Sequence, residues 1–173
     1  MLYGFDGKTP EIGKETYVSE HALVVGDVKI GDNCYIGHGA ILRGDYGSIL
    51  IGSGTAVEEG VIIHAPPKRV STIGDRVTIG HGAVIHSAKI GNFTVIGMGA
   101  VLSLDSEIGQ HTIVAEGSVV RKGQIIPDRV VVGENPAREL RAISEKDIEF
   151  WDMGKDLYIN LAKKYLATGM EKL

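Results

Sequence analysis

The stretch IGDRVTIGHGAVIHSAKIG, residues 73–91, places an aliphatic residue at every sixth position from Ile73 to Ile85 and another at Ile90. The same period runs from Ile12 to Val132, and a small or branched residue follows most of these aliphatics four positions later. Six residues suit one short strand and a turn, and three such units close a triangular coil. The period therefore predicts an all-β solenoid, a parallel β-helix of about six to seven coils around an aliphatic core.

The period is interrupted at three points, and each interruption falls after the third strand of a coil. The spacing of the aliphatic residues widens to nine after Leu42 and to ten after Ile63, and it shrinks to five after Ile85. These departures gather at one corner of the triangle. Insertions on one edge of a solenoid commonly mark its functional side.

Two histidines occupy the same position in neighbouring coils. His64 and His86 each follow a third-strand aliphatic, as does Arg43, so the three should form one column with neighbours about 4.8 Å apart. His81 follows the second strand and should point away from this column. Two imidazoles at that separation can bind one metal ion, and His81 of an adjoining solenoid can supply a third ligand. The sequence thus predicts a metal site shared between subunits, with a cyclic trimer as the natural closed assembly.

A histidine at a solenoid turn is most often only a solvated polar residue, and this alternative stays open for the three candidates. His21, His38 and His111 illustrate it, because none of them shares the phase of His64 and His86. We expect these three histidines at the surface, without a role in the site.

Composition argues against a nucleic-acid or membrane partner. The 173 residues carry a net charge of −4, and the basic residues are scattered rather than clustered. No apolar run reaches membrane-spanning length, and residues 1–15 lack the basic-then-apolar pattern of a signal peptide. Cys34 is the single cysteine, which excludes an intrachain disulfide and suits a reducing compartment. We therefore expect a soluble cytoplasmic protein that binds neither nucleic acid nor membranes.

With the repeat and the histidines in place, the chain resembles the gamma-class carbonic anhydrase family over nearly its whole length. The resemblance rests on RGD at 43–45, VEEGVIIHAPP at 57–67, the stretch at 73–91, IGMGA at 96–100 and VGENPAREL at 132–140. It implies a left-handed solenoid that assembles as a homotrimer, with one metal ion, Zn2+ or Fe2+, at each subunit interface. It also implies reversible hydration of CO2 to bicarbonate.

The resemblance assigns roles to individual residues. The metal ligands match His64, His81 and His86. Three neutral imidazoles leave an open position for water, so that a metal-bound hydroxide can attack CO2. Arg43 and Asp45 match residues that build the subunit interface and orient the site; a direct catalytic role and a plain interface salt bridge are equally good interpretations of the two.

The chain departs from the best-studied type of the family in two places. Glu58 and Glu59 stand where that type has glutamine and aspartate, and Ala56 replaces an asparagine. Glu58 can accept a proton and is therefore a candidate base or proton relay. The segment APPKRVST, residues 65–72, has no acid and replaces the loop that carries the family type's proton-shuttle glutamate. We expect slow turnover or another proton route.

The repeat ends before Pro136. We expect an N-terminal arm at 1–11, the β-helix at 12–135 and a C-terminal helical segment at 136–173. Ser144 opens the motif SEKD, which predicts a helix N-terminus.

An apolar stripe on this helix should pack along the solenoid and cover it. The stripe comprises Ile148, Trp151, Leu157, Tyr158, Leu161, Ala162, Tyr165 and Leu166. Tyr158 and Asn160 also match a tyrosine and an asparagine that lie near the metal in the family.

Two other functions remain open. Hexapeptide solenoids also serve as acyl-CoA-dependent acyltransferases, which use a single histidine as general base in a subunit cleft. Some relatives in the family are non-catalytic, metal-holding assembly subunits, and the missing shuttle loop keeps this alternative open.

Overall fold

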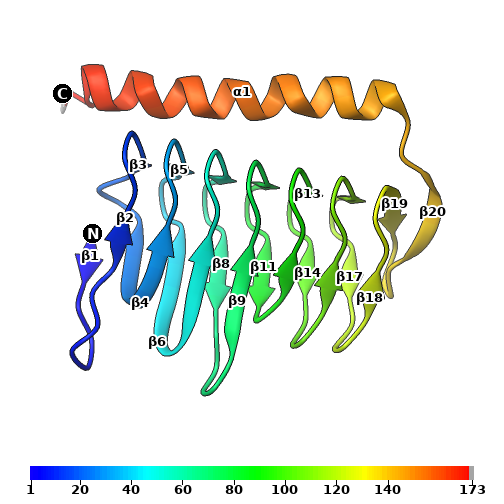
Figure 1. The fold of residues 1–173 in the computed structure, drawn as a ribbon, viewed down its shortest axis with the longest axis horizontal. Helices are drawn as coiled ribbons and strands as arrows, with labels where there is room; N and C mark the ends of the chain where they lie inside the picture. The colour runs from blue at the N-terminus through cyan, green and yellow to red at the C-terminus, as the bar shows by residue number, and fades with distance from the viewer. Residues whose placement is uncertain (172–173) are drawn as a thin grey trace.

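The chain forms the predicted left-handed parallel β-helix of about seven turns, with one helix lying along it (Figure 1). The computed structural model describes residues 1–171, so positions 172 and 173 of the predicted C-terminal segment lie outside the described residues. Among the described residues no helix is both long enough and apolar enough to cross a membrane.

Each coil contributes strands to three faces. The first face contains β2 (Glu11–Ile12), β9 (Val70–Ile73), β12 (Lys89–Ile90), β15 (Glu107–Ile108) and β18 (Ile125–Ile126). The second contains β3 (Tyr17–Val18), β5 (Tyr35–Ile36), β7 (Ala56–Val57), β10 (Thr78–Ile79), β13 (Val95–Ile96), β16 (Ile113–Val114) and β19 (Val130–Gly133). The third contains β1 (Leu2–Tyr3), β8 (Ile62–His64), β11 (Val84–His86), β14 (Val101–Leu102) and β17 (Val119–Val120).

Two long strands join the third face to the first. β4 (Leu23–Ile30) and β6 (Ile41–Ile51) run through the corner between these faces, so both faces belong to one twelve-stranded sheet. The second face forms an eight-stranded sheet, in which β20 (Arg138–Ala142) pairs antiparallel with β19. The loop that joins β8 to β9 projects farthest from the edge opposite the helix (Figure 1). The insertions in the repeat therefore lie at this corner.

Inward-facing aliphatic side chains fill the solenoid. Ile36, Val57, Ile79 and Ile96 succeed one another on the second face, each completely buried. Parallel pairing places residues of equal phase on top of each other, which is why a six-residue period builds a continuous core. At the next corner Gly82 has a φ of 69°, a left-handed conformation that glycine adopts without strain. This turn ends the second face and leaves His81 on the outside.

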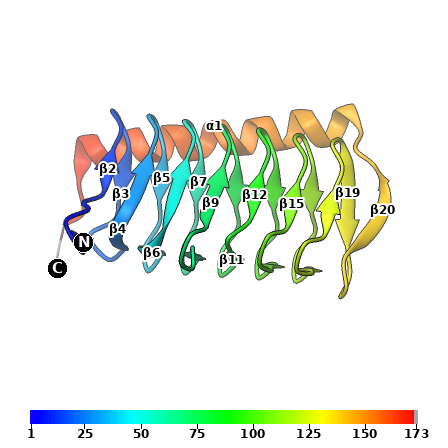
Figure 2. The ribbon, with the colours of Figure 1, turned by 60° about the horizontal axis from the view of Figure 1, so that its bottom comes forward.

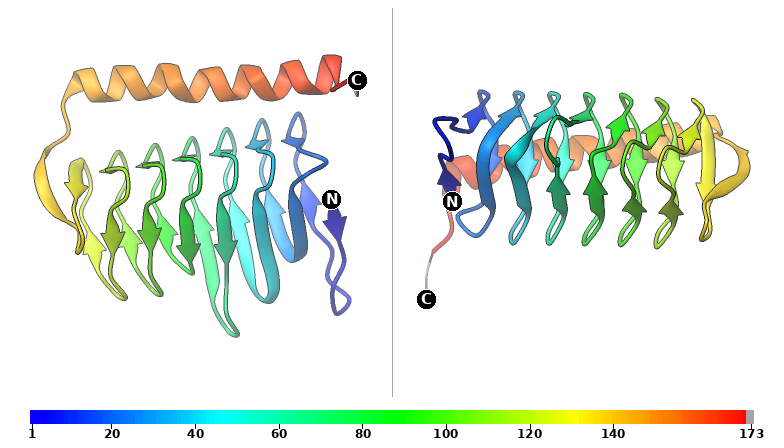
Figure 3. Two further views of the ribbon diagram at one scale, coloured as in Figure 1. Left: turned by 180° about the vertical axis from the view of Figure 1, so that it is seen from behind. Right: turned by 90° about the horizontal axis from the view of Figure 1, so that it is seen from below.

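The helix α1 (Glu145–Thr168) follows the second face from the last coil back to the first (Figure 2, Figure 3). The Ser144 hydroxyl accepts a hydrogen bond from the backbone N–H of Asp147, and the Asp147 carboxylate accepts one from the backbone N–H of Ser144. The predicted cap is confirmed. Arg141 adds an ion pair of 2.6 Å to Asp147, which ties the helix start to β20.

The packing face of α1 is narrower than the predicted stripe. Ala162 is buried against the second face, where it packs with Tyr17 and Tyr35. Leu157 and Leu166 are 69% and 53% exposed, so their assignment to the packing stripe is wrong. Because α1 contacts a single face of the solenoid, part of its apolar surface is left outside.

Candidate metal centre

His64 and His86 lie directly above one another at the corner between the third and first faces. Pairing of β8 with β11 aligns His64 with His86, and pairing of β6 with β8 aligns Arg43 with His64. The two imidazole rings are stacked, with centroids 5.3 Å apart and planes inclined by 11°. The predicted column is confirmed.

His64 presents an unpartnered ring nitrogen. Its Nε2 is buried and has no hydrogen-bond partner among residues 1–171. Burial lowers the pKa of His64, Arg43 and His86 lower it further, and Asp45 opposes them. A neutral imidazole with a free nitrogen is the form that binds a metal ion. The histidine pair therefore fits a divalent transition metal.

Asp45 faces the same nitrogen. Its Oδ2 accepts a hydrogen bond of 2.8 Å from Arg43, and its Oδ1 lies 3.9 Å from His64 Nε2. Oδ1 also accepts a hydrogen bond from the backbone N–H of Tyr46. Burial raises the pKa of Asp45, but the hydrogen bond and charge of Arg43 outweigh it and the pKa is lowered. Asp45 is thus an ionised carboxylate beside the histidine column.

His81 lies at the other edge of the third face, between two carboxylates of the preceding coil. Its Nε2 is 3.0 Å from Glu58 Oε2, and its Nδ1 is 2.8 Å from Glu59 Oε2. The second oxygen of Glu59 accepts a hydrogen bond of 2.6 Å from the hydroxyl of Tyr35. Sequence reasoning missed Tyr35. The only sequence signal for it is that Tyr35 lies at the same position of the repeat as the strand that precedes Glu59.

The two carboxylates beside His81 differ in electrostatics. Glu58 is 5% exposed, and burial raises its pKa against the opposing effects of His81 and the Tyr158 hydroxyl. Glu59 is also desolvated, but the hydrogen bond from Tyr35 and the charge of His81 lower its pKa overall. Of the two, Glu58 is the better proton acceptor near neutral pH.

The tyrosine and the asparagine of α1 do not lie together. Tyr158 reaches Glu58. Burial raises the pKa of the Tyr158 hydroxyl, and the neighbouring Glu58 carboxylate raises it further. Asn160 is exposed, and no hydrogen bond among residues 1–171 joins it to Glu58 or His81. Within one chain Tyr158 thus belongs to the His81 corner and Asn160 does not.

The remaining histidines are placed differently from expectation in two cases. His38 is partly buried, with Nδ1 2.6 Å from the Ser19 hydroxyl and Nε2 3.3 Å from that of Tyr165. His111 is partly buried and stacks on Phe93, with ring centroids 4.7 Å apart. The helix covers both positions, which the repeat alone does not reveal.

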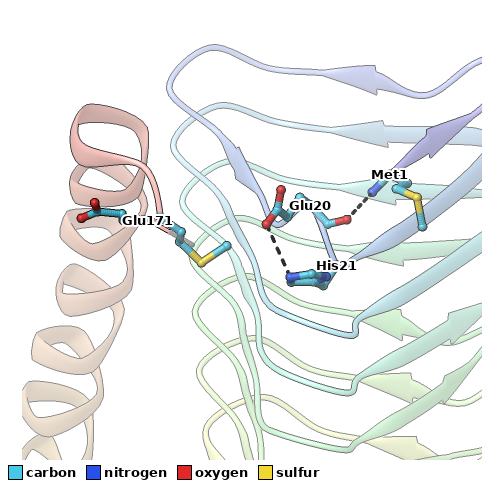
Figure 4. A pocket seen from close by; sticks show the side chains of 5 residues that line it. Met1, Glu20, His21 and Glu171 are labelled. Atoms are coloured by element: carbon cyan, nitrogen blue, oxygen red, sulfur yellow. Dashed lines mark hydrogen bonds and ion pairs between the residues drawn. The ribbon is translucent and has the colours of Figure 1, made fainter. Parts of the chain in front are cut away.

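His21 is exposed, as expected. It borders a hollow of about 710 Å³ at the N-terminal end, together with Met1, Glu20, Met170 and Glu171 (Figure 4). Its Nε2 is 3.5 Å from Glu20, at the end of the solenoid, so it takes no part in either histidine corner.

One chain does not complete a metal site. Within residues 1–171 no three His, Cys, Asp or Glu side chains are arranged to hold a metal ion. His64 and His86 lie where the third face meets the first, and His81 lies where it meets the second. A site that uses all three histidines therefore needs a second chain.

The outward residues of the three faces differ in character. On the first face they include the ion pairs Lys29–Glu11 and Lys89–Glu107, of 2.9 and 2.8 Å, which suit contact with water. The second face is covered by α1. The outward residues of the third face form an aliphatic ladder that no other element of residues 1–171 covers: Leu23, Ile41, Ile62, Val84, Val101 and Val119. Sequence reasoning missed this ladder, although each member directly precedes an inward aliphatic residue.

Comparisons with known proteins agree with this architecture. Residues 9–44 match the family model described as bacterial transferase hexapeptide (six repeats). A crystal structure of a hexapeptide transferase family protein from Anaplasma phagocytophilum superposes with a TM-score of 0.91 at 30% identity, covering 95% of this chain and 98% of that one. The chain is therefore a hexapeptide-repeat protein.

Two curated relatives narrow the class. The chain is 38% identical over its whole length to gamma carbonic anhydrase 1, mitochondrial, of Arabidopsis thaliana, of which it spans 65%. It is 34% identical to carnitine operon protein CaiE of Proteus sp., with 92% of this chain and 81% of that protein aligned. The chain belongs to the gamma-carbonic-anhydrase-like family of hexapeptide proteins.

Proposed function

We propose that the protein catalyses the reversible, metal-dependent hydration of CO2 to bicarbonate at sites shared between the subunits of a homotrimer. The observation that carries the proposal is the stacked pair His64–His86 with its buried, unpartnered His64 Nε2. His64 and His86 of one subunit and His81 of the next would hold zinc, or ferrous iron. The donor set of three imidazoles is typical of catalytic rather than structural zinc.

A cyclic trimer brings the two kinds of corner together. Three copies whose third faces turn toward a common axis form a triangle, and each vertex joins the His81 corner of one copy to the His64 corner of the next. His81 and His86 lie in the same coil, so rotation about an axis parallel to the solenoid keeps them at equal height. The aliphatic ladder supplies the apolar surface that such an assembly buries.

The residues around the three histidines suit the reaction. A metal ion held there would supply the Lewis acidity that makes water a nucleophile near neutral pH. Glu58 arrives with His81 and, with its raised pKa, can take the proton that the water loses. Arg43 and Asp45 arrive with His64, where Asp45 can orient a ligating imidazole and Arg43 can attract bicarbonate.

The proposal is tested by stopped-flow CO2 hydration with metal content assayed on the same sample. The protein is loaded with zinc or, without oxygen, with ferrous iron, and His86→Ala is the control. We expect hydration that requires metal and disappears in the control. A fully metallated trimer without hydration would refute the enzymatic function and favour a metal-holding assembly subunit.

Acyl transfer is the second candidate, because the matching family model and the similar crystal structure both carry the word transferase. An acyltransferase that uses one histidine as general base needs no metal. Activity toward acyl-CoA in protein stripped of metal would favour it over CO2 hydration.

A further inference from the structure

His81 is held differently from the other two histidines. Both of its ring nitrogens face carboxylates, at 3.0 Å for Glu58 and 2.8 Å for Glu59. His64, in contrast, has an unpartnered Nε2. The orientation of His81 is therefore set within its own chain, before any second subunit approaches.

We propose that Tyr35 and Glu59 are positioning residues that fix the proton of His81 on Nδ1 and so reserve Nε2 for the metal. The inference rests on the proposed function, because it concerns a ligand of the proposed centre. A neutral imidazole carries one N–H, so the two carboxylates compete for it. Glu59 is the closer of the two and is held in place by Tyr35, whereas Glu58 Oε2 already accepts a hydrogen bond from the backbone N–H of His81, so we assign the proton to Nδ1. The lone pair then lies on Nε2, the nitrogen that faces Glu58.

Glu59 is firmly anchored. Its Oε1 accepts a hydrogen bond of 2.6 Å from Tyr35, while Oε2 faces His81. Tyr35 is 2% exposed, and its ring stacks on Tyr17 at 5.6 Å and lies 5.3 Å from Tyr158 of the helix. Each step from Tyr35 to Glu59 and from Glu59 to His81 leads to the next coil of the solenoid. Packing of α1 on the second face thereby sets the direction of a histidine two coils away.

Glu58 is the carboxylate that can release His81. Its Oε2 also accepts a hydrogen bond of 3.1 Å from the backbone N–H of His81, and Tyr158 provides a further partner. The carboxylate therefore stays partnered when the ring nitrogen leaves it. Glu59 can keep its contact with Nδ1 when Nε2 leaves Glu58, because Nδ1 lies on the other side of the imidazole ring.

The tautomer of His81 provides a direct test in metal-free protein. Long-range ¹H–¹⁵N spectra of the full chain are recorded above neutral pH, and zinc affinity is measured separately by competition with a chelating dye. We expect the Nδ1–H tautomer in the wild type. In Glu59→Gln the side-chain amide can donate to Nδ1, which shifts the proton to Nε2, and zinc affinity should fall about 10- to 100-fold.

Two further variants frame the result. Tyr35→Phe should keep the Nδ1–H tautomer and lose less zinc affinity than Glu59→Gln, since it loosens the carboxylate without replacing it. Glu116→Gln is the matched control, because Glu116 is an exposed glutamate at the same phase three coils beyond Glu59, and it should change neither quantity.

The outcomes separate the two proposals. A Glu59→Gln protein that keeps the Nδ1–H tautomer and the wild-type zinc affinity would overturn the positioning role. A wild-type protein that binds no zinc would refute the proposed function. In that case an inverted tautomer in Glu59→Gln would still support the control of His81 by Glu59.

Discussion

Mixing two inactive variants tests whether the histidines of one site come from two chains. His81→Ala keeps the pair His64–His86, and His64→Ala keeps His81. Neither variant alone can form a complete site. In a mixed trimer, an interface is intact where a His81→Ala chain supplies the histidine pair and a His64→Ala chain follows it in the ring.

The expected recovery follows from the geometry alone. With equal amounts and random assembly, one neighbour is the right variant with probability one half and the other likewise, so about one quarter of the sites are intact. The same fraction holds for any closed ring with this head-to-tail arrangement. Unfolding and refolding the two variants together, followed by assay of bound zinc and CO2 hydration, should therefore recover about a quarter of the wild-type value.

A second mixture provides the negative control. His64→Ala mixed with His86→Ala should recover nothing, because the two residues pair within one chain. Recovery in this control would mean that the stacked pair is not the ligand unit. No recovery in the first mixture, from variants that still assemble, would show that His81 is not supplied by a neighbouring chain.

Three further predictions concern the surfaces around the site. Ile62→Lys should dissociate the trimer in analytical ultracentrifugation, because it places a charge on the aliphatic ladder. Leu50→Lys should leave the trimer intact, although Leu50 lies on the first face and is as exposed as Ile62 (39% in both). Equal behaviour of the two variants would contradict the assignment of the ladder as the subunit contact. Burial lowers the pKa of Lys155 to about 8 from 10.5, so between these values the unfolded chain binds a proton that the folded chain lacks, and stability rises with pH. Urea unfolding of Lys155→Met should lack this rise and show a gain of roughly 1–3 kcal/mol at neutral pH, and an unchanged pH dependence would refute the reasoning. Ser144→Ala should cost about 1 kcal/mol in the same assay through loss of the helix cap, and a variant as stable as wild type would show that the cap is unimportant.

The repeat carries most of the fold and half of the site. A six-residue period requires parallel coils in register, so the positions of Ile79 in the core and of His64 above His86 follow from counting residues. This works because the register of a solenoid is set by hydrogen bonds between neighbouring coils, and each coil repeats the same local geometry.

The contacts of the helix could not be predicted by counting residues. The partial burial of His38 and the exposure of Leu157 depend on where α1 lies on the second face, and the ring of Tyr35, which anchors Glu59, lies against Tyr158 of the helix. Helix docking brings together segments that are far apart in the sequence, and the apolar pattern of α1 does not indicate which side of the helix is buried.

The sequence by itself thus determined the solenoid, its corners and the column of histidines, because these depend on a short repeated hydrogen-bond pattern. Only the tertiary structure decided which apolar face stays partly exposed in the described residues, and which carboxylates hold His81. The physical reason is that side-chain packing between the helix and the second face has no period. It is set by the shapes and hydrogen-bonding groups that meet when the whole chain is folded.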